Sequence, residues 1–199
     1  MRRIIFLSVL LAGCALTKKS KPLEVRYFSP EAARAQPAPA VATGLELRIG
    51  RITGPRYLKD EIVYRDGGQE LGFYPGRRWI EPPEQYLRRA FIRELFQVRG
   101  IRQVVAGAAV TLDVELDTFE ERRSPRRVAR VELSWRLRTD KVVLVQRTIA
   151  VDEPIGRQAP GAPDAVASAM ARALTEALHR AVADIVVALT EPAVSQAAL

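Results

Sequence analysis

In VTLDVELD, residues 110–117, every second residue is apolar, and this segment indicates the architecture of the domain. Successive side chains of a β-strand point to opposite faces, so this period of two predicts a strand with one buried and one solvated face. The same alternation returns in residues 130–137 (RVELSWRL) and 142–151 (VVLVQRTIAV). Three such strands in succession predict an antiparallel meander.

Two other segments have helical spacing. Pro82 and Pro83 suit the first turn of a helix, and apolar residues then recur every three or four positions up to Val98. A second stripe of this kind runs from Asp164 to Thr190. A sheet with one apolar face and two helices with one apolar stripe each predict an α+β fold, in which a two-layer, largely antiparallel sheet carries two amphipathic helices packed on one face.

The first half of the chain adds shorter elements. Residues 23–28 and 45–52 read as strands, and residues 62–64 and 71–74 flank Asp66-Gly67-Gly68 as a short hairpin. Residues 29–44 are rich in Ala and Pro and predict a loop.

The N-terminus reads as a targeting signal. Two arginines precede the apolar run Ile4 to Leu11, and small residues follow before Cys14, the only cysteine of the chain. The run is about half of the ~20 residues that a spanning helix needs. The sequence Leu11-Ala12-Gly13-Cys14 resembles the bacterial lipoprotein signal, which implies cleavage between Gly13 and Cys14 and lipidation of Cys14, including an acyl chain such as palmitate.

The whole chain has 199 residues and a formal net charge of +8. We expect a signal peptide at residues 1–13, a lipidated N-terminus and tether at 14–22, one domain at 23–192 and a tail at 193–199. The mixed charges and the apolar content of 48% exclude a disordered polyelectrolyte and a multi-pass membrane protein.

Few residues could carry chemistry. One Cys and one His cannot form a zinc site, and His179 falls off the apolar stripe of its helix, so we expect it to be solvated. Three carboxylates share the polar face of one strand, and three arginines on neighbouring strands predict an ion-paired face rather than a metal site: Asp113, Glu115 and Asp117 against Arg130, Arg136 and Arg138. No catalytic or phosphate-binding motif is present in the sequence. We therefore expect a protein that is not an enzyme and that binds no cofactor or metal.

The densest group of positive charges lies between two strands of the predicted meander and comprises Arg122, Arg123, Arg126 and Arg127. Two interpretations stay open, a solvated hairpin tip and a contact for a partner or a phospholipid headgroup. No aromatic stacking motif accompanies these arginines and an export signal precedes them, so nucleic-acid binding is disfavoured. Trp79 lies where a strand leads into a helix, and we expect a buried anchor there rather than a ligand-facing indole.

In this order, the elements resemble the ABC-type transport auxiliary lipoproteins, the PqiC/YmbA-like group. The residues that carry the resemblance are Arg26-Tyr27-Phe28, Pro55-Arg56-Tyr57-Leu58, Ile62-Val63-Tyr64-Arg65, Arg78-Trp79, Thr118-Phe119-Glu120 and the Ala-rich last helix. Within these motifs Tyr57, Leu58, Tyr64, Arg78 and Trp79 are the family positions that we single out. The chain departs from the family pattern where Ser29-Pro30 follows the first strand.

The resemblance implies a noncatalytic periplasmic lipoprotein that works with an MCE-domain protein and an ABC permease and ATPase in lipid transport between two membranes, and so in membrane integrity. Ala15 after the lipidated cysteine resembles the address for the periplasmic face of the outer membrane in a Gram-negative bacterium. The alternative is a structural lipoprotein that braces an outer-membrane assembly or barrel. The sequence leaves open the transported lipid, the docking residues and whether the chain forms a homo-oligomer.

Overall fold

The predicted meander forms the longest strands of the sheet. The computed structural model describes residues 23–30, 41–157, 164–192 and 194. In it β6 (Thr111–Arg122), β7 (Val128–Arg138) and β8 (Val143–Pro154) pair antiparallel along almost their whole length. Their apolar side chains are buried at every second position of β7, as the alternation predicted.

Five shorter strands complete an eight-stranded sheet: β1 (Arg26–Phe28), β2 (Glu46–Thr53), β3 (Glu61–Arg65), β4 (Leu71–Trp79) and β5 (Arg102–Gln103). The predicted hairpin is confirmed, because β3 and β4 pair antiparallel. The sheet is nevertheless mixed, since β2 and β3 both run parallel to β6, at its beginning and at its end respectively. The short strands β1 and β5 also pair in parallel, with β4 and β2.

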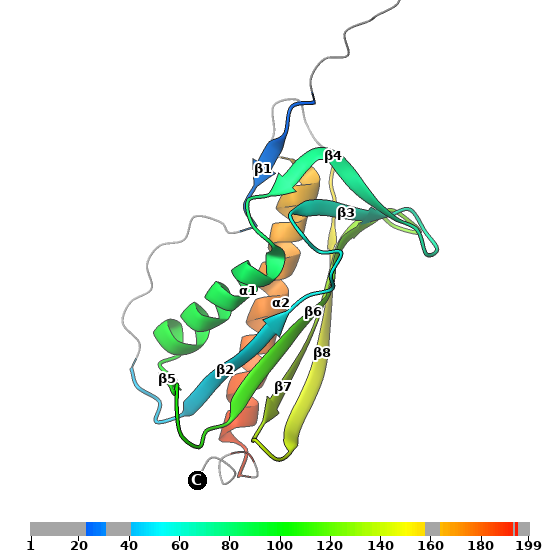
Figure 1. The fold of residues 1–199 in the computed structure, drawn as a ribbon. Helices are drawn as coiled ribbons and strands as arrows, with labels where there is room; N and C mark the ends of the chain where they lie inside the picture. Colours follow the sequence, from blue (N-terminus) through cyan, green and yellow to red (C-terminus); the bar gives the residue numbers. More distant parts are fainter. Residues whose placement is uncertain (1–22, 31–40, 158–163, 193, 195–199) are drawn as a thin grey trace, which may run out of the picture.

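Two helices cover the sheet (Figure 1). Helix α1 (Pro83–Ile92) begins with Pro at its first position and continues into a π-helical turn, Arg93–Val98. Helix α2 (Ala165–Thr190) begins at Asp164, whose carboxylate accepts hydrogen bonds from the backbone N–H groups of Val166 and Ala167. Such an N-cap satisfies amides that have no partner within the helix.

The core lies between these helices and the sheet. Helix α1 packs against β2, α2 packs against β7 and β8, and the two helices contact each other. Leu47, Leu112, Leu133 and Ile185 are fully buried in this layer. The α+β architecture predicted from the sequence is therefore confirmed.

Trp79 is the buried anchor that its position predicted. Its indole is 1% exposed and stacks on Phe119 of β6 with ring centroids 5.2 Å apart. The indole therefore joins the end of β4 to the central strand, just before α1 begins.

One irregularity in β6 changes which residues face the core. The register of β6 against β7 shifts between Leu116 and Thr118, so Asp117 is an extra residue in the ladder. Before this bulge Leu116 faces the helices, and after it Phe119 does. A bulge moves the alternation by one position, and it places Glu120 on the open face and Glu121 on the helix-facing side.

Candidate functional site: the arginine turn

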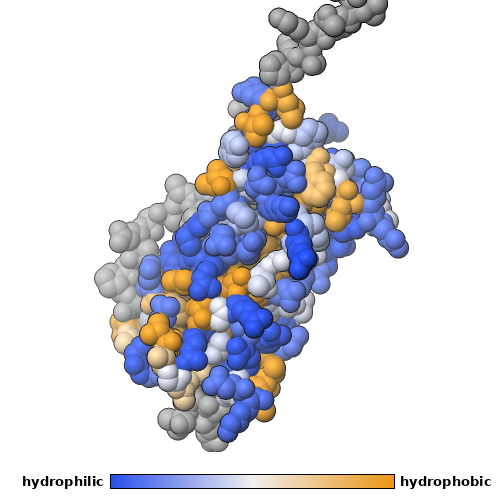
Figure 2. All heavy atoms as spheres, in the orientation of Figure 1, coloured by the Kyte–Doolittle hydropathy of each residue, from blue (hydrophilic) through white to orange (hydrophobic). Residues whose placement is uncertain are grey.

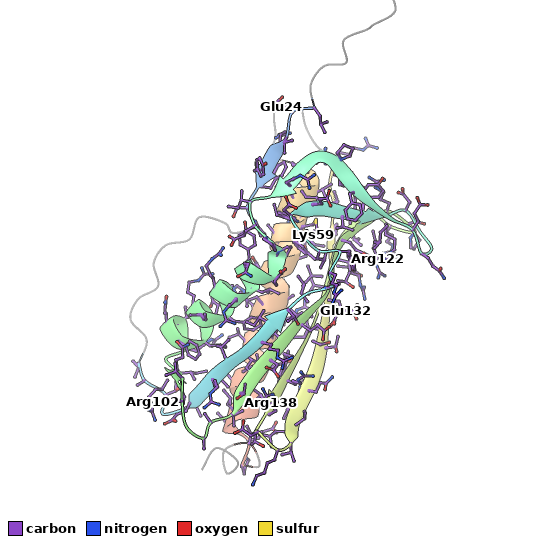
Figure 3. All side chains as sticks on the ribbon, in the orientation of Figure 1. Glu24, Lys59, Arg102, Arg122, Glu132 and Arg138 are labelled. Atoms are coloured by element: carbon purple, nitrogen blue, oxygen red, sulfur yellow. The ribbon has the colours of Figure 1, made fainter. Side chains whose placement is uncertain are left out.

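The arginine turn, which we define as Arg122, Arg123, Arg126 and Arg127, connects β6 to β7 at one end of the sheet. It lies against the turn that joins β3 to β4: a Cβ atom on Gly67 would be 3.7 Å from Cβ of Ser124. The backbone N–H of Arg123 also donates to the carbonyl oxygen of Arg65 at 2.9 Å. Two turns that are far apart in sequence therefore form one surface, near the position at which Figure 3 labels Arg122.

Glu120 organises the arginines on the open face of the sheet. Its side chain is 1% exposed, and both carboxylate oxygens accept hydrogen bonds from Arg65, at 2.8 Å and 3.1 Å. Arg122, two residues further along the same strand, donates to Glu120 at 3.4 Å. The hydrogen bond with Glu120 raises the pKa of Arg65, so this guanidinium stays charged. One buried carboxylate thus orients two guanidinium groups.

Glu121 does the same on the opposite side of the strand. Its carboxylate is fully buried and accepts hydrogen bonds from Arg127 at 2.6 Å and from Arg123 at 3.3 Å. The hydroxyl of Tyr74 also donates to Glu121. Burial raises the pKa of Tyr74, and its hydrogen bond to the carboxylate raises it further, so the phenol remains protonated and able to donate.

Two tyrosine rings hold Arg123 in place. Its guanidinium carbon lies 3.4 Å from the ring centroid of Tyr64 and 5.1 Å from that of Tyr74. The two rings meet edge to face with centroids 5.1 Å apart. Arg123 also binds Asp66 at 3.0 Å. Stacking on an aromatic face suits the planar guanidinium, and these contacts leave Arg123 little freedom.

Burying a carboxylate is costly unless charged partners remain beside it. Glu120 and Glu121 therefore require their arginines, and the arginines are fixed in return. The outer parts of the guanidinium groups are still accessible, because the side chains of Arg122 and Arg127 are 40% and 47% exposed. Arg126 is exposed and makes no ion pair with any residue that the structure describes.

A polar cleft of about 300 Å³ opens beside this cluster. Its lining comes from both turns: Arg65, Gly67, Gly68, Arg122 and Ser124. Guanidinium groups form charge-assisted hydrogen bonds with phosphate and carboxylate groups, often two at a time. The arrangement can therefore bind an anionic group of a partner or of a lipid.

The sequence identified the four arginines but not the groups that hold them. The structure brings Arg122, Arg123 and Arg127 together through the adjacent carboxylates of Glu120 and Glu121. Two consecutive glutamates at the end of a strand give no local signal of burial. The only available signal was the number of arginines around them.

The polar face of the meander is ion-paired, as expected, although the partners differ in part. Asp113 accepts hydrogen bonds from Arg138 at 2.8 Å and Arg136 at 3.3 Å. Asp117 instead accepts from the hydroxyl of Ser134 at 2.6 Å, because the bulge displaces it. Arg130 turns to Asp152 of β8, at 2.9 Å.

The other singled-out residues lie away from the arginine turn or beside it. His179 on α2 is exposed, as expected, and so is Glu115. Leu58 is buried. Two family positions border the arginine turn. Tyr64 stacks on Arg123, and Tyr57 lies near Glu120, where burial first and the neighbouring carboxylate second raise its pKa. Arg78 lies elsewhere and pairs with Glu61 at 3.0 Å.

The predicted signal peptide, Gly13, the lipidation site Cys14 and the tether to residue 22 lie outside the described residues, as do the loop segment 31–40 and residues 193 and 195–199 of the tail. Within the part of the chain that the structure describes, no helix is both long and apolar enough to cross a membrane. In the same part, no three Cys, His, Asp or Glu side chains group as metal ligands would.

Comparison with known proteins gives a family and a fold. A family model described as "ABC-type transport auxiliary lipoprotein component" matches residues 28–186. No curated protein matches the sequence. The crystal structure of protein XCC0632 from Xanthomonas campestris, of family DUF330, is similar at 22% identity with a TM-score of 0.69, over 82% of this chain and 96% of that one. An uncharacterized protein is similar at 16% identity with a TM-score of 0.61, over 81% of this chain and 99% of that one.

Proposed function

Because this chain belongs to the family of ABC-type transport auxiliary lipoprotein components, we propose that it is the noncatalytic, lipid-anchored member of a system that moves lipid between two membranes. An MCE-domain protein and an ABC permease with its ATPase would be its partners. The match of residues 28–186 is the observation that carries this proposal, since it spans β2 to β8, α1 and most of α2.

The division of labour follows from the chemistry of lipids. A lipid that crosses an aqueous gap needs an apolar conduit, because its chains are costly to expose to water. The conduit must also be held at the far membrane. A folded domain tethered to acyl chains on Cys14 can supply that attachment without any catalytic group, and Ala15 supports the periplasmic face of the outer membrane as its place.

The arginine turn is the surface that we propose for docking the MCE partner or a phospholipid headgroup. Buried Glu120 and Glu121 hold the guanidinium groups in place, so little conformational freedom is lost when an acidic surface binds them. Arg126 makes no ion pair with a described residue. Removal of Arg122 leaves Glu120 paired with Arg65. These two arginines can therefore be removed without leaving a buried carboxylate alone.

The test is affinity purification of the full-length protein from detergent-solubilised envelopes, with identification of the proteins that co-purify. We expect an MCE-domain protein and an ABC ATPase. A double variant, Arg122→Ser with Arg126→Ser, should recover less of the MCE-domain protein, and the recovery should depend less on salt, because exposed charges are screened over about 8–10 Å near physiological ionic strength.

The matched control is Arg147→Ser, which removes an exposed arginine of β8 that pairs with Trp135 inside the ladder, away from the turn before Val128. Recovery with this variant should equal that of the unchanged protein. Equal recovery with the double variant would contradict a docking role for the arginine turn. Co-purification of an outer-membrane barrel in place of the MCE-domain protein would favour the structural bracing function.

A further inference from the structure

Hydrophobic side chains gather at the end of the domain that carries β1. Leu23, Val25, Tyr27 and Ile80, which we call the β1 surface, are 67%, 41%, 62% and 59% exposed. Figure 2 shows hydrophobic surface gathered over β1, and further hydrophobic patches lie elsewhere on the same face. Scattered exposed apolar residues are ordinary, but a contiguous group of them marks a contact surface.

Strand geometry places these residues together. In the parallel ladder Tyr27 pairs with Arg78, so Tyr27 and Ile80 point to the same side, away from buried Trp79. The backbone N–H of Ile80 donates to the carbonyl oxygen of Phe28 at 3.0 Å, which fixes Ile80 beside the end of β1. Leu23 lies over Gly76, where an added Cβ would be 3.2 Å from its Cδ1.

Charge in the segment before and within β1 is positive on balance, with Lys18, Lys19, Lys21 and Arg26 against Glu24. Arg77 binds Asp164 at 3.1 Å and Arg78 binds Glu61 at 3.0 Å, so both are neutralised locally. Arg26 makes no ion pair with a described residue and lies 5.3 Å from the Phe28 ring. The sequence just before the domain adds Lys18, Lys19 and Lys21. Glu24, labelled in Figure 3, is the acidic residue between Lys18 and Phe28.

The covalent structure limits how far this surface can be from a bilayer. Residues 15–22 connect Cys14 to Leu23, and nine peptide steps span at most about 30 Å even when fully extended. Helix α2, which runs along the domain, is about 39 Å long at 1.5 Å per residue. The β1 end therefore stays within about 30 Å of a membrane that contains the acyl chains in every orientation, whereas the opposite end can lie farther away.

We propose that the β1 surface rests on the lipid bilayer that holds Cys14, with its apolar side chains in the interfacial region. The inference rests on the proposed lipidation of Cys14. Aromatic and aliphatic side chains flanked by cations bind at such interfaces, and anionic headgroups attract the neighbouring Arg and Lys residues. This contact gives the domain a fixed orientation, with β1 at the membrane and the turn between β7 and β8 pointing away (Figure 1).

The test uses the full mature lipoprotein in vesicles of phosphatidylethanolamine and phosphatidylglycerol with brominated acyl chains, which quench nearby tryptophan emission. Ile80→Trp places a probe on the β1 surface. Val142→Trp is the matched control, because Val142 is 56% exposed and lies in the turn between β7 and β8. Trp79 and Trp135 are both 1% exposed and give a common background, measured in the unchanged protein.

We expect the brominated lipids to quench the added emission of Ile80→Trp and to leave the added emission of Val142→Trp unchanged. Equal quenching of both probes would overturn the fixed orientation, and no quenching of Ile80→Trp would overturn the membrane contact and point to a protein on this surface. Mass spectrometry of the same samples separates the proposed lipidation of Cys14 from the proposed membrane contact. If the chain is acylated but Ile80→Trp is not quenched, the lipidation proposal stands and the membrane contact fails. A chain without acyl groups would overturn both.

Discussion

Asp113 is a buried charge on the open face of the sheet, and its surroundings explain how it stays ionised. It is 6% exposed and accepts hydrogen bonds from Arg138, Arg136 and the backbone N–H of Arg51. Gly50 makes this close approach of β2 feasible, since a Cβ there would be 2.1 Å from the carboxylate oxygen. Burial alone would raise the pKa of Asp113, but these hydrogen bonds outweigh it and lower the pKa below its ordinary value.

Asp113→Asn should therefore cost about 1.5–3 kcal/mol of stability near neutral pH, the range for hydrogen bonds to a charged group. The folded state has the lower pKa, so the ionised carboxylate stabilises the fold above about pH 4, the value in the unfolded chain, and loses that effect as pH falls toward the folded-state value. Urea unfolding from pH 7 to pH 3 should show the difference from the unchanged protein shrinking in acid. Glu115→Gln, an exposed neighbour on the same strand, should show no such trend. A constant difference at every pH would contradict this account.

At the scale of an element, helix α2 is held in place by the burial of one side. One stripe of it is buried against β7 and β8 and the opposite side is solvated, although the whole helix is rich in Ala. Its two ends are well defined, by the Asp164 N-cap at the start and by Glu191 and Pro192 at the end. Packing of the stripe, more than intrinsic helix propensity, holds such a helix in place.

Leu178→Ala should lower the free energy of unfolding by about 2–5 kcal/mol, because Leu178 is 3% exposed and its loss leaves a cavity. His179→Ala, one position along the same helix, changes an exposed residue and should alter it by less than about 0.5 kcal/mol. Denaturant unfolding of both variants measures the contrast. Similar losses at the two positions would mean that the buried stripe is incorrectly placed.

Local periodicity made α2 and the meander predictable from sequence, because each element's own residues carry its pattern. It could not show that β2 and β3 pair with β6, since pairing partners leave no local signal. Nor could it show the bulge at Asp117, which shifts the alternation and buries Glu120 and Glu121. The candidate site was therefore found by its arginines, while its geometry required the structure.

At the scale of the whole molecule, function depends on where the domain is held. The described part of the chain contains no helix that could span a membrane, and the proposed attachment is chemical, through Cys14. Several acyl chains give stable anchoring where one gives only reversible binding. With the domain anchored as proposed, the fold would set which surfaces face the bilayer and which face a partner.

Cys14→Ser should abolish acylation, and the protein should either appear in the soluble periplasmic fraction or stay attached through an uncleaved signal. Cell fractionation with mass spectrometry of the N-terminus distinguishes these forms. Ser20→Ala, a change within the tether, should leave acylation and membrane attachment as they are. A Cys14→Ser protein that is processed normally and remains bound to the membrane would refute lipid anchoring.

The parallel pairing of β2 with β6 also has a consequence for the order of folding. Apart from two residues of β5, the ladder partner of β2 is β6, which begins only at Thr111. When the chain emerges starting from its N-terminus, β2 therefore has no β6 partner until more than half of the sequence has emerged. Pairing over such separations is slow, typically milliseconds to seconds, and an open edge invites aggregation. Incomplete chains should therefore depend on a holding chaperone until β6 emerges, whereas the hairpin of β3 and β4 can close at once.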